Sequence, residues 1–85
     1  MEYKWTNFKG DALVKPEEVK GYDELIDSHK ELFAAFLNNY YKGWEYPEDH
    51  MPLKVTFKSD NDAGNYLRVD FKDCWLHVKN QNTWY

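Results

Sequence analysis

The stretch that decides the fold runs from Asp23 to Lys42 and reads DELIDSHKELFAAFLNNYYK. At 100° per residue, its apolar side chains return every three or four positions and share one broad helical face. Asp23 is a favourable N-cap, and Gly43 follows as a C-terminal stop. The apolar face comprises Leu25, Ile26, His29, Leu32, Phe33, Phe36, Leu37 and Tyr40. The sequence therefore predicts one long amphipathic helix, whose apolar face must be covered by another element.

Three runs after this helix alternate apolar and polar side chains with the period of a β-strand. They span Leu53–Lys58, Asn65–Phe71 and Trp75–Lys79. Turn-forming residues fill positions 59–64, and Lys72-Asp73 makes a tighter turn, which favours an antiparallel meander. One face of such a sheet is buried and the other is open to water. The inward positions are Leu53, Val55, Phe57, Leu67, Val69, Phe71, Leu76 and Val78.

The segment before the helix predicts one more strand. Residues 3–8 alternate, with Tyr3, Trp5 and Asn7 on one side, and the stretch ends at Gly10. Pro16 favours a short helical turn that Gly21 ends. We therefore expect a single α+β domain over residues 1–85, with one long amphipathic helix packed on an antiparallel sheet of three to four strands in β-α-β-β-β order. The chain is too short for two cores of ordinary size.

Composition excludes several classes of protein. Aromatic residues make up 19% of the chain, which argues against disorder, and the single Cys74 cannot form a disulfide within it. A net charge of −4 excludes the strongly basic class that coats nucleic acid. The longest apolar run, Leu32–Leu37, is too short to span a membrane. No secretory signal is visible, so we expect a cytoplasmic protein that does not bind membranes.

Acidic side chains gather in the first part of the chain. Residues 1–51 hold six lysines and eleven acidic residues, a net charge of −5, whereas residues 52–85 carry +1. Glu24, Asp27 and Glu31 fall opposite the apolar helical face and form an acidic ridge. Such a ridge favours association with a basic surface.

Aromatic and acidic residues also alternate where the helix ends. Tyr41 is expected to point away from the core, and Trp44 and Tyr46 follow the helix stop in a loop. Exposed aromatic rings with carboxylates around them are typical of protein interfaces. The structural alternative is that Trp44 folds back to close the core. The predicted partner-binding residues are Glu24, Asp27, Glu31, Tyr41, Trp44, Glu45 and Tyr46.

The outward face of the meander indicates a second kind of binding. Aromatic rings beside cations on an open sheet can stack bases and follow a phosphate backbone. Two structural alternatives are an ordinary solvated face with cross-strand pairs, and a Trp75 that the N-terminal strand or the C-terminal tail covers. The candidate nucleic-acid residues are Lys54, Lys58, Tyr66, Arg68, Trp75, His77 and Lys79.

No pattern in the sequence indicates catalysis or a metal site. His29 lies on the apolar helical face without a nucleophile or an orienting acid nearby, so we interpret it as a neutral core histidine. Cys74 and His77 are three apart on a strand and face opposite sides. Asp60 and Asp62 begin like a calcium loop, but its required glutamate is absent. We expect no catalytic residue, no metal and no cofactor.

The sequence favours a non-enzymatic protein-binding module that occludes a basic surface of a partner protein. Small acidic domains of this size include inhibitors, immunity proteins and antitoxins, some of them phage-borne. The alternative function is binding of single-stranded nucleic acid through the outward sheet face. Trp84-Tyr85 either adds a strand to a sister chain or lies on the core.

Overall fold

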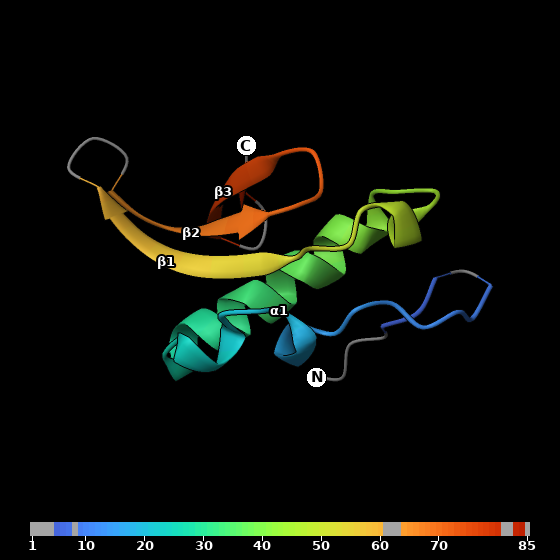
Figure 1. The fold of residues 1–85 in the computed structure, drawn as a ribbon, viewed down its shortest axis with the longest axis horizontal. Helices are drawn as coiled ribbons and strands as arrows, with labels where there is room; N and C mark the ends of the chain where they lie inside the picture. The colour runs from blue at the N-terminus through green and yellow to red at the C-terminus, as the bar shows by residue number, and fades with distance from the viewer. Residues whose placement is uncertain (1–4, 8, 61–63, 81–82, 85) are drawn as a thin grey trace.

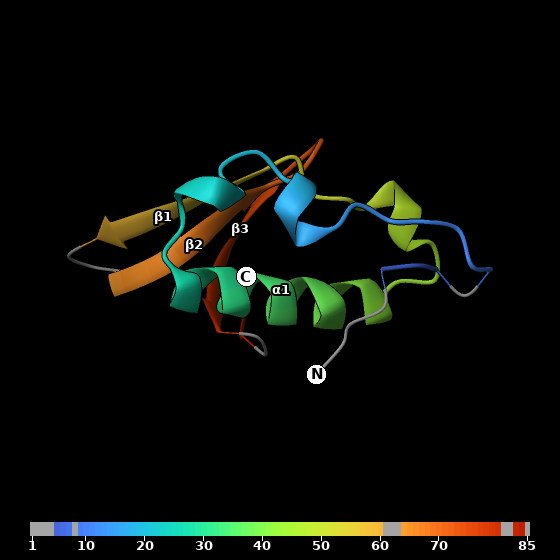
Figure 2. The same ribbon diagram turned by 90° about the horizontal axis from the view of Figure 1, so that it is seen from below.

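The computed structural model describes residues 5–7, 9–60, 64–80 and 83–84. These residues form η1 (Pro16–Glu18), η2 (Tyr22–Glu24), α1 (Asp27–Lys42), η3 (Pro47–Asp49), β1 (Lys54–Asp60), β2 (Gly64–Asp70), β3 (Trp75–Asn80) and β4 (Thr83–Trp84), where η denotes a 3₁₀-helix. The strands make one antiparallel sheet in the order β1-β2-β3-β4 (Figure 1). Figure 2 shows α1 and the sheet as two layers. The predicted α+β class, with a helix packed on an antiparallel sheet, is confirmed.

The predicted N-terminal strand is wrong for the part of it that the structure describes, residues 5–7. Thr6 instead pairs with Ala12 in an isolated antiparallel bridge. The side-chain Oδ1 of the buried Asn7 accepts hydrogen bonds from the backbone N–H groups of Lys9 and Asp11, both at 2.9 Å. These local bonds turn the segment back on itself, so it does not join the sheet. The order of the main elements is therefore α-β-β-β-β, and the rest of the predicted strand lies outside the described residues.

The long helix begins later than predicted. Tyr22–Glu24 form η2, Leu25 has extended backbone, and Ile26 occupies the N-cap position of α1 without a side-chain cap. Asp23 is therefore not the N-cap. The interruption reorients the chain between the two layers, which places Leu25 in the core and leaves Ile26 exposed instead of on the buried face. The predicted end is confirmed, because the N–H of Gly43 donates to the carbonyl of Tyr40 at 3.1 Å.

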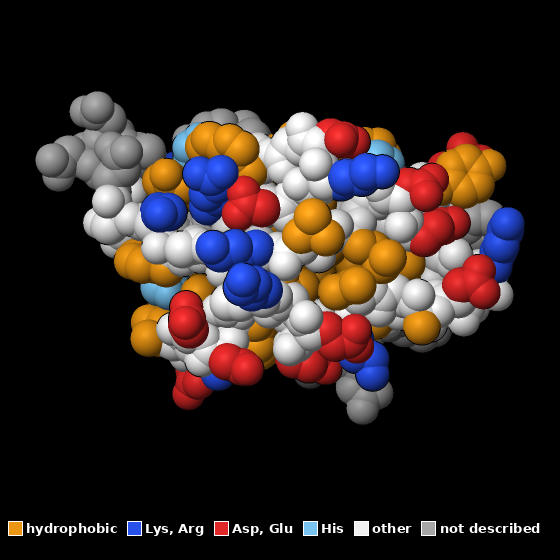
Figure 3. Space-filling view, in the orientation of Figure 1, with side chains coloured by type: hydrophobic (Ala, Val, Ile, Leu, Met, Phe, Trp, Pro, Cys, Tyr) orange, Lys and Arg blue, Asp and Glu red, His pale blue; other side chains and the backbone are white. Residues whose placement is uncertain are grey.

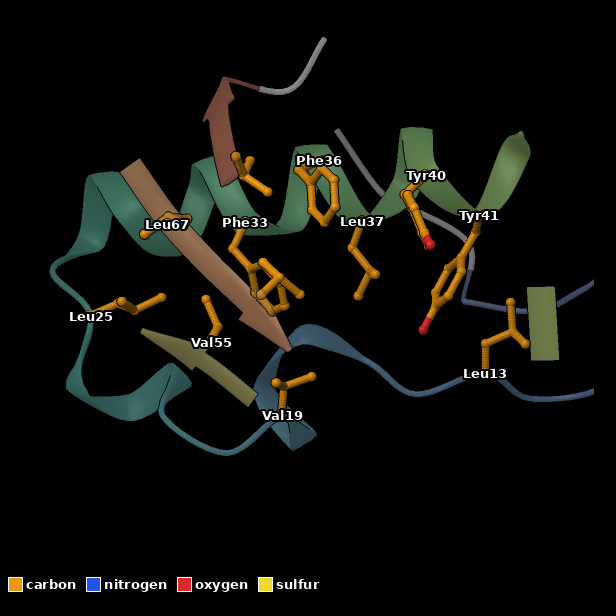
Figure 4. Close-up of a cluster of buried hydrophobic side chains, with 12 residues drawn as sticks. Leu13, Val19, Leu25, Phe33, Phe36, Leu37, Tyr40, Tyr41, Val55 and Leu67 are labelled. Carbon is orange, nitrogen blue, oxygen red and sulfur yellow. The ribbon is translucent and has the colours of Figure 1, made fainter. Parts of the chain in front are cut away.

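The core fills the space between α1 and the inner face of the sheet. Cross-strand pairing joins Val55 with Val69 and Leu67 with Val78, and all four side chains are fully buried. Figure 4 shows ring and aliphatic side chains of α1 pointing towards this layer. The fully buried residues of the helix are Phe33, Phe36 and Leu37.

Two of the predicted inward positions of the sheet are wrong. Leu53 is 60% exposed, because it precedes β1 and strand alternation holds only within the paired strand. Phe57 is 39% exposed, and its ring stacks on His29 with a 4.5 Å centroid distance. His29 is therefore a half-buried residue at the edge of the core and not a central core histidine.

Candidate functional site

The outward side chains of the sheet come together in rows across the strands. Antiparallel pairing places Lys54 opposite Asp70 and Asp70 opposite Trp75. The next row runs through Thr56, Arg68 and His77, and the third joins Lys58 to Tyr66. Residues paired across neighbouring strands point to the same side of a sheet. We call the surface made by Lys54, Lys58, Tyr66, Arg68, Trp75, His77 and Lys79 the outer sheet face, and it unites all seven candidate nucleic-acid residues.

Three aromatic rings of this face form a continuous row, which we call the ring row. The His77 ring lies between Tyr66 and Trp75, with centroid distances of 4.5 and 4.6 Å. Trp75 is 41% exposed, so neither the described N-terminal segment nor β4 covers it. The ring row therefore offers aromatic surface to a ligand from solvent.

Cationic groups lie beside both ends of the ring row. The Arg68 guanidinium carbon is 4.3 Å from the centroid of the Trp75 ring, and the Lys79 ammonium is 5.8 Å from that of Tyr66. Both distances fall within the range of a cation–π interaction. Arg68 Nε also donates to Asp70 Oδ1 at 3.0 Å, so the guanidinium is held from two directions. The arginine is thereby positioned over the tryptophan before any ligand arrives.

The outer sheet face is positive although the chain as a whole is negative. Figure 3 shows Lys and Arg side chains gathered left of the centre of the view, with histidine and hydrophobic groups beside them, while most acidic side chains lie lower and to the right. A parallel bridge adds Lys20 beside Lys54 at the edge of β1. No local pattern in the sequence indicates Lys20, because only the folded chain brings residues 20 and 54 together.

The predicted acidic ridge and the aromatic loop do not form one surface. Glu24, Asp27 and Glu31 are exposed, but Glu24 lies in η2 and not on α1. The Trp44 loop follows the other end of α1 (Figure 1). The helix between them has 16 residues and is about 24 Å long at 1.5 Å per residue. A partner must therefore contact one of these regions or be large enough to reach both.

The prediction for Tyr41 is wrong, because its side chain is buried. Its hydroxyl donates to the carbonyl oxygen of Val14 at 2.9 Å, and its ring meets Trp5 edge-on at 6.3 Å. Burial raises the pKa of the Tyr41 phenol well above its ordinary value, and the nearby Glu18 carboxylate raises it further. The N-terminal segment covers this part of α1, so Tyr41 stabilises the fold and cannot contact a partner.

Trp44 is partly folded back and partly open. Its ring stacks on His50 at 3.6 Å between centroids and meets Tyr40 edge-on at 5.8 Å. It remains 42% exposed, and the neighbouring Glu45 and Tyr46 are exposed as well. One face of the indole therefore lies against Tyr40 and His50, while the rest of the ring meets solvent.

Neither metal chemistry nor a known relative guides the assignment of a site. Among the described residues, no three His, Cys, Asp or Glu side chains are grouped so that they could hold a metal ion. None of the helices described is long and apolar enough to cross a membrane. A scan against models of protein families and searches of curated proteins and solved structures found no match to this chain.

Proposed function

We propose that this protein binds single-stranded nucleic acid on the outer sheet face. The observation that carries the proposal is the ring row, in which the half-buried rings of Tyr66 and His77 continue the exposed ring of Trp75. Aromatic side chains on an open sheet stack on bases, and each stacked base contributes roughly 1–3 kcal/mol of binding free energy. The ring row therefore provides the apolar part of the interaction.

The charge around the ring row suits a phosphate backbone. Lys54, Lys58, Arg68 and Lys79 belong to this face, and Asp70 lies in the same row as Lys54. Asp70 is already paired with Arg68, which reduces its repulsion of phosphate. Local positive potential can attract an anion to one face of a protein whose net charge is negative. The acidic residues elsewhere then orient the strand towards the sheet.

The geometry favours single strands over duplexes. Stacking on a side-chain ring requires a base whose face is exposed, and bases within a duplex are already stacked on each other. Every base has an aromatic face, so the ring row alone gives little sequence preference.

The proposal predicts that Trp75→Ala weakens binding of a short single-stranded oligonucleotide by about tenfold to a hundredfold, because one stacked base is lost. Fluorescence anisotropy of a labelled oligonucleotide measures the dissociation constant, and affinity should fall steeply as salt rises. Trp44→Ala is the matched control, since Trp44 is 42% exposed against 41% for Trp75 but lies in the loop after α1 and not on the outer sheet face. Unchanged affinity in a folded Trp75→Ala protein, or no binding by the wild type at low salt, would contradict the proposal.

A second candidate function is protein binding by a small acidic inhibitor, immunity or antitoxin-type module. Two observations favour it, the exposed acidic residues near the start of α1 and the exposed Trp44 and Tyr46 in the loop after it. Exposed Trp and Tyr are enriched among residues that dominate protein interfaces. The partner in this case is a protein with a basic surface, and binding covers that surface.

This second candidate predicts that charge reversal of the acidic ridge slows association. In a Glu24→Lys, Asp27→Lys, Glu31→Lys protein, we expect the association rate with a captured basic partner to fall about tenfold or more at low salt, because electrostatic steering is lost. Surface plasmon resonance measures this rate, and circular dichroism verifies the fold. Capture with and without nuclease separates a protein partner from nucleic acid. An association rate equal to that of the wild type would remove the ridge from the interface.

A further inference from the structure

The Arg68 side chain is held in a way that leaves part of its guanidinium open. This group is planar, and its N–H bonds point outward within the plane. Nε donates to Asp70 Oδ1 at 3.0 Å, so the carboxylate contacts one edge of the plane. The guanidinium carbon lies over the Trp75 ring, 4.3 Å from its centroid, so the indole covers one face. The second face and the two Nη groups therefore remain for a ligand.

The surroundings of Arg68 keep that second face accessible. The side chain is 38% exposed. Among the residues that the structure describes, it has no hydrogen-bond, ion-pair or ring partner other than Asp70 and Trp75. A ligand that approaches Trp75 over this side of the ring meets the guanidinium before it meets the indole.

The sheet fixes the arrangement of these three residues. Arg68 and Asp70 are two positions apart on β2, so their side chains lie on the same side of the sheet. Trp75 of β3 pairs with Asp70, which makes it the diagonal neighbour of Arg68. An arginine held at one edge and one face loses less side-chain freedom when it binds a ligand than an unrestrained arginine does.

We propose that Arg68 is a base-stacking residue of the outer sheet face and that Asp70 is its positioning residue. One base of the bound strand lies on the open face of the guanidinium, with the Trp75 ring behind it. Guanidinium planes stack on unpaired bases as aromatic side chains do. This inference rests on the proposed function and assigns to Arg68 a contact with a base, where charge alone would assign it only to phosphate.

The first test replaces the plane and keeps the charge. We expect Arg68→Lys to weaken binding of a labelled oligothymidine of roughly six nucleotides about tenfold, with the salt dependence of the wild type. Arg68→Ala removes both plane and charge, so it should bind still more weakly and show a shallower salt dependence. Fluorescence anisotropy measures both quantities, and circular dichroism verifies the fold. An affinity of Arg68→Lys within about twofold of the wild type would overturn the inference.

An abasic nucleotide moved through the same oligonucleotide shows whether the lost contact is to a base. At one position, we expect the abasic nucleotide to weaken binding by the wild type about tenfold but binding by Arg68→Lys less than about twofold. Equal losses in the two proteins at every position would assign Arg68 to phosphate and overturn the inference, while the proposed function would stand. Absence of any oligonucleotide binding by the wild type would overturn both.

The role of Asp70 is tested by the sign of an effect. Asp70→Ala removes a negative charge from a surface that binds an anion, yet we expect binding about threefold weaker, because Arg68 is no longer held. Asp73→Ala is the control, since Asp73 is exposed in the turn between β2 and β3 and its loss changes the charge equally. Its affinity should equal or exceed that of the wild type.

Two further measurements separate positioning from a general structural role. In an Arg68→Lys background, Asp70→Ala should strengthen binding, because only the repulsion between the carboxylate and phosphate is then removed. In nuclear magnetic resonance spectra, the Arg68 Nε–H should exchange with water faster in Asp70→Ala than in the wild type. Stronger binding by the single variant Asp70→Ala, or an unchanged exchange rate of the Arg68 Nε–H, would overturn the role of Asp70.

Discussion

Replacing Gly21 with alanine is expected to lower the free energy of unfolding by about 3 kcal/mol or more. Gly21 has a φ of +92°, a left-handed conformation that side chains with a Cβ rarely adopt. An added Cβ would also overlap the backbone carbonyl oxygen of Val55 in β1. Backbone atoms cannot rotate away as a flexible side chain can, so either η2 or β1 must move. The energetic cost of the left-handed backbone and that of the overlap with Val55 therefore add at this position.

Gly10→Ala separates these two causes. Gly10 has a φ of +88°, nearly the same as Gly21, but a Cβ there would meet no atom within 4 Å. We expect this control to cost only about 1–2 kcal/mol, the cost of the left-handed backbone alone. Urea unfolding followed by circular dichroism gives both values from the same assay. Equal losses of unfolding free energy in the two variants would show that the close approach of Gly21 to Val55 does not contribute to the cost of the substitution.

The position of Gly21 also matters for the outer sheet face. The backbone carbonyl of the preceding residue, Lys20, accepts a hydrogen bond from the N–H of Val55 at 2.9 Å. Lys20 also pairs with Lys54 across the parallel bridge. A displacement of η2 away from β1 would carry Lys20 with it. Gly21→Ala should therefore also weaken oligonucleotide binding by the folded protein. Measuring the folded fraction separates this loss of affinity from the loss of stability.

The period of the sequence was enough to predict the outer sheet face, because alternation assigns each strand residue to one side once the strands are paired. Trp75, His77 and Arg68 follow directly from that rule. Their mutual distances depend on register, which the lengths of the turns and the buried partners determine. The sequence therefore predicts which residues of the three strands lie on the outer sheet face, but not which of them are in contact.

Tertiary contacts decided the positions that the sequence could not predict. Gly21 reads locally as a helix stop, and its close approach to Val55 exists only in the folded chain. Tyr41 has a helical position outside the main apolar stripe, and it is buried because the N-terminal segment covers it. Propensity and periodicity describe elements, whereas these features depend on how elements meet.

The core prediction with the largest expected effect concerns Phe36, a residue of α1 whose ring contacts Trp84 of β4. Its side chain is fully buried, and its ring lies 5.2 Å from Trp84 and 5.4 Å from Tyr40 between centroids. Trp84 belongs to β4 and packs on the core of its own chain, which favours this role over the addition of a strand to a sister chain. Tyr85 lies outside the described residues. The ring of Phe36 therefore joins α1 to the last strand of the sheet.

Phe36→Ala is expected to lower the free energy of unfolding by about 3–5 kcal/mol, because it removes a buried ring and leaves a cavity. Native proteins are stable by roughly 5–15 kcal/mol, and short chains lie near the lower end, so a large fraction of this variant should be unfolded at 25 °C. Phe57→Ala removes the same ring from a site that is 39% exposed, and should cost roughly half as much or less. Urea midpoints of the two proteins provide the comparison. Similar losses in the two variants would mean that full burial of the Phe36 ring against Tyr40 and Trp84 gives it no greater weight than the partly exposed Phe57 ring.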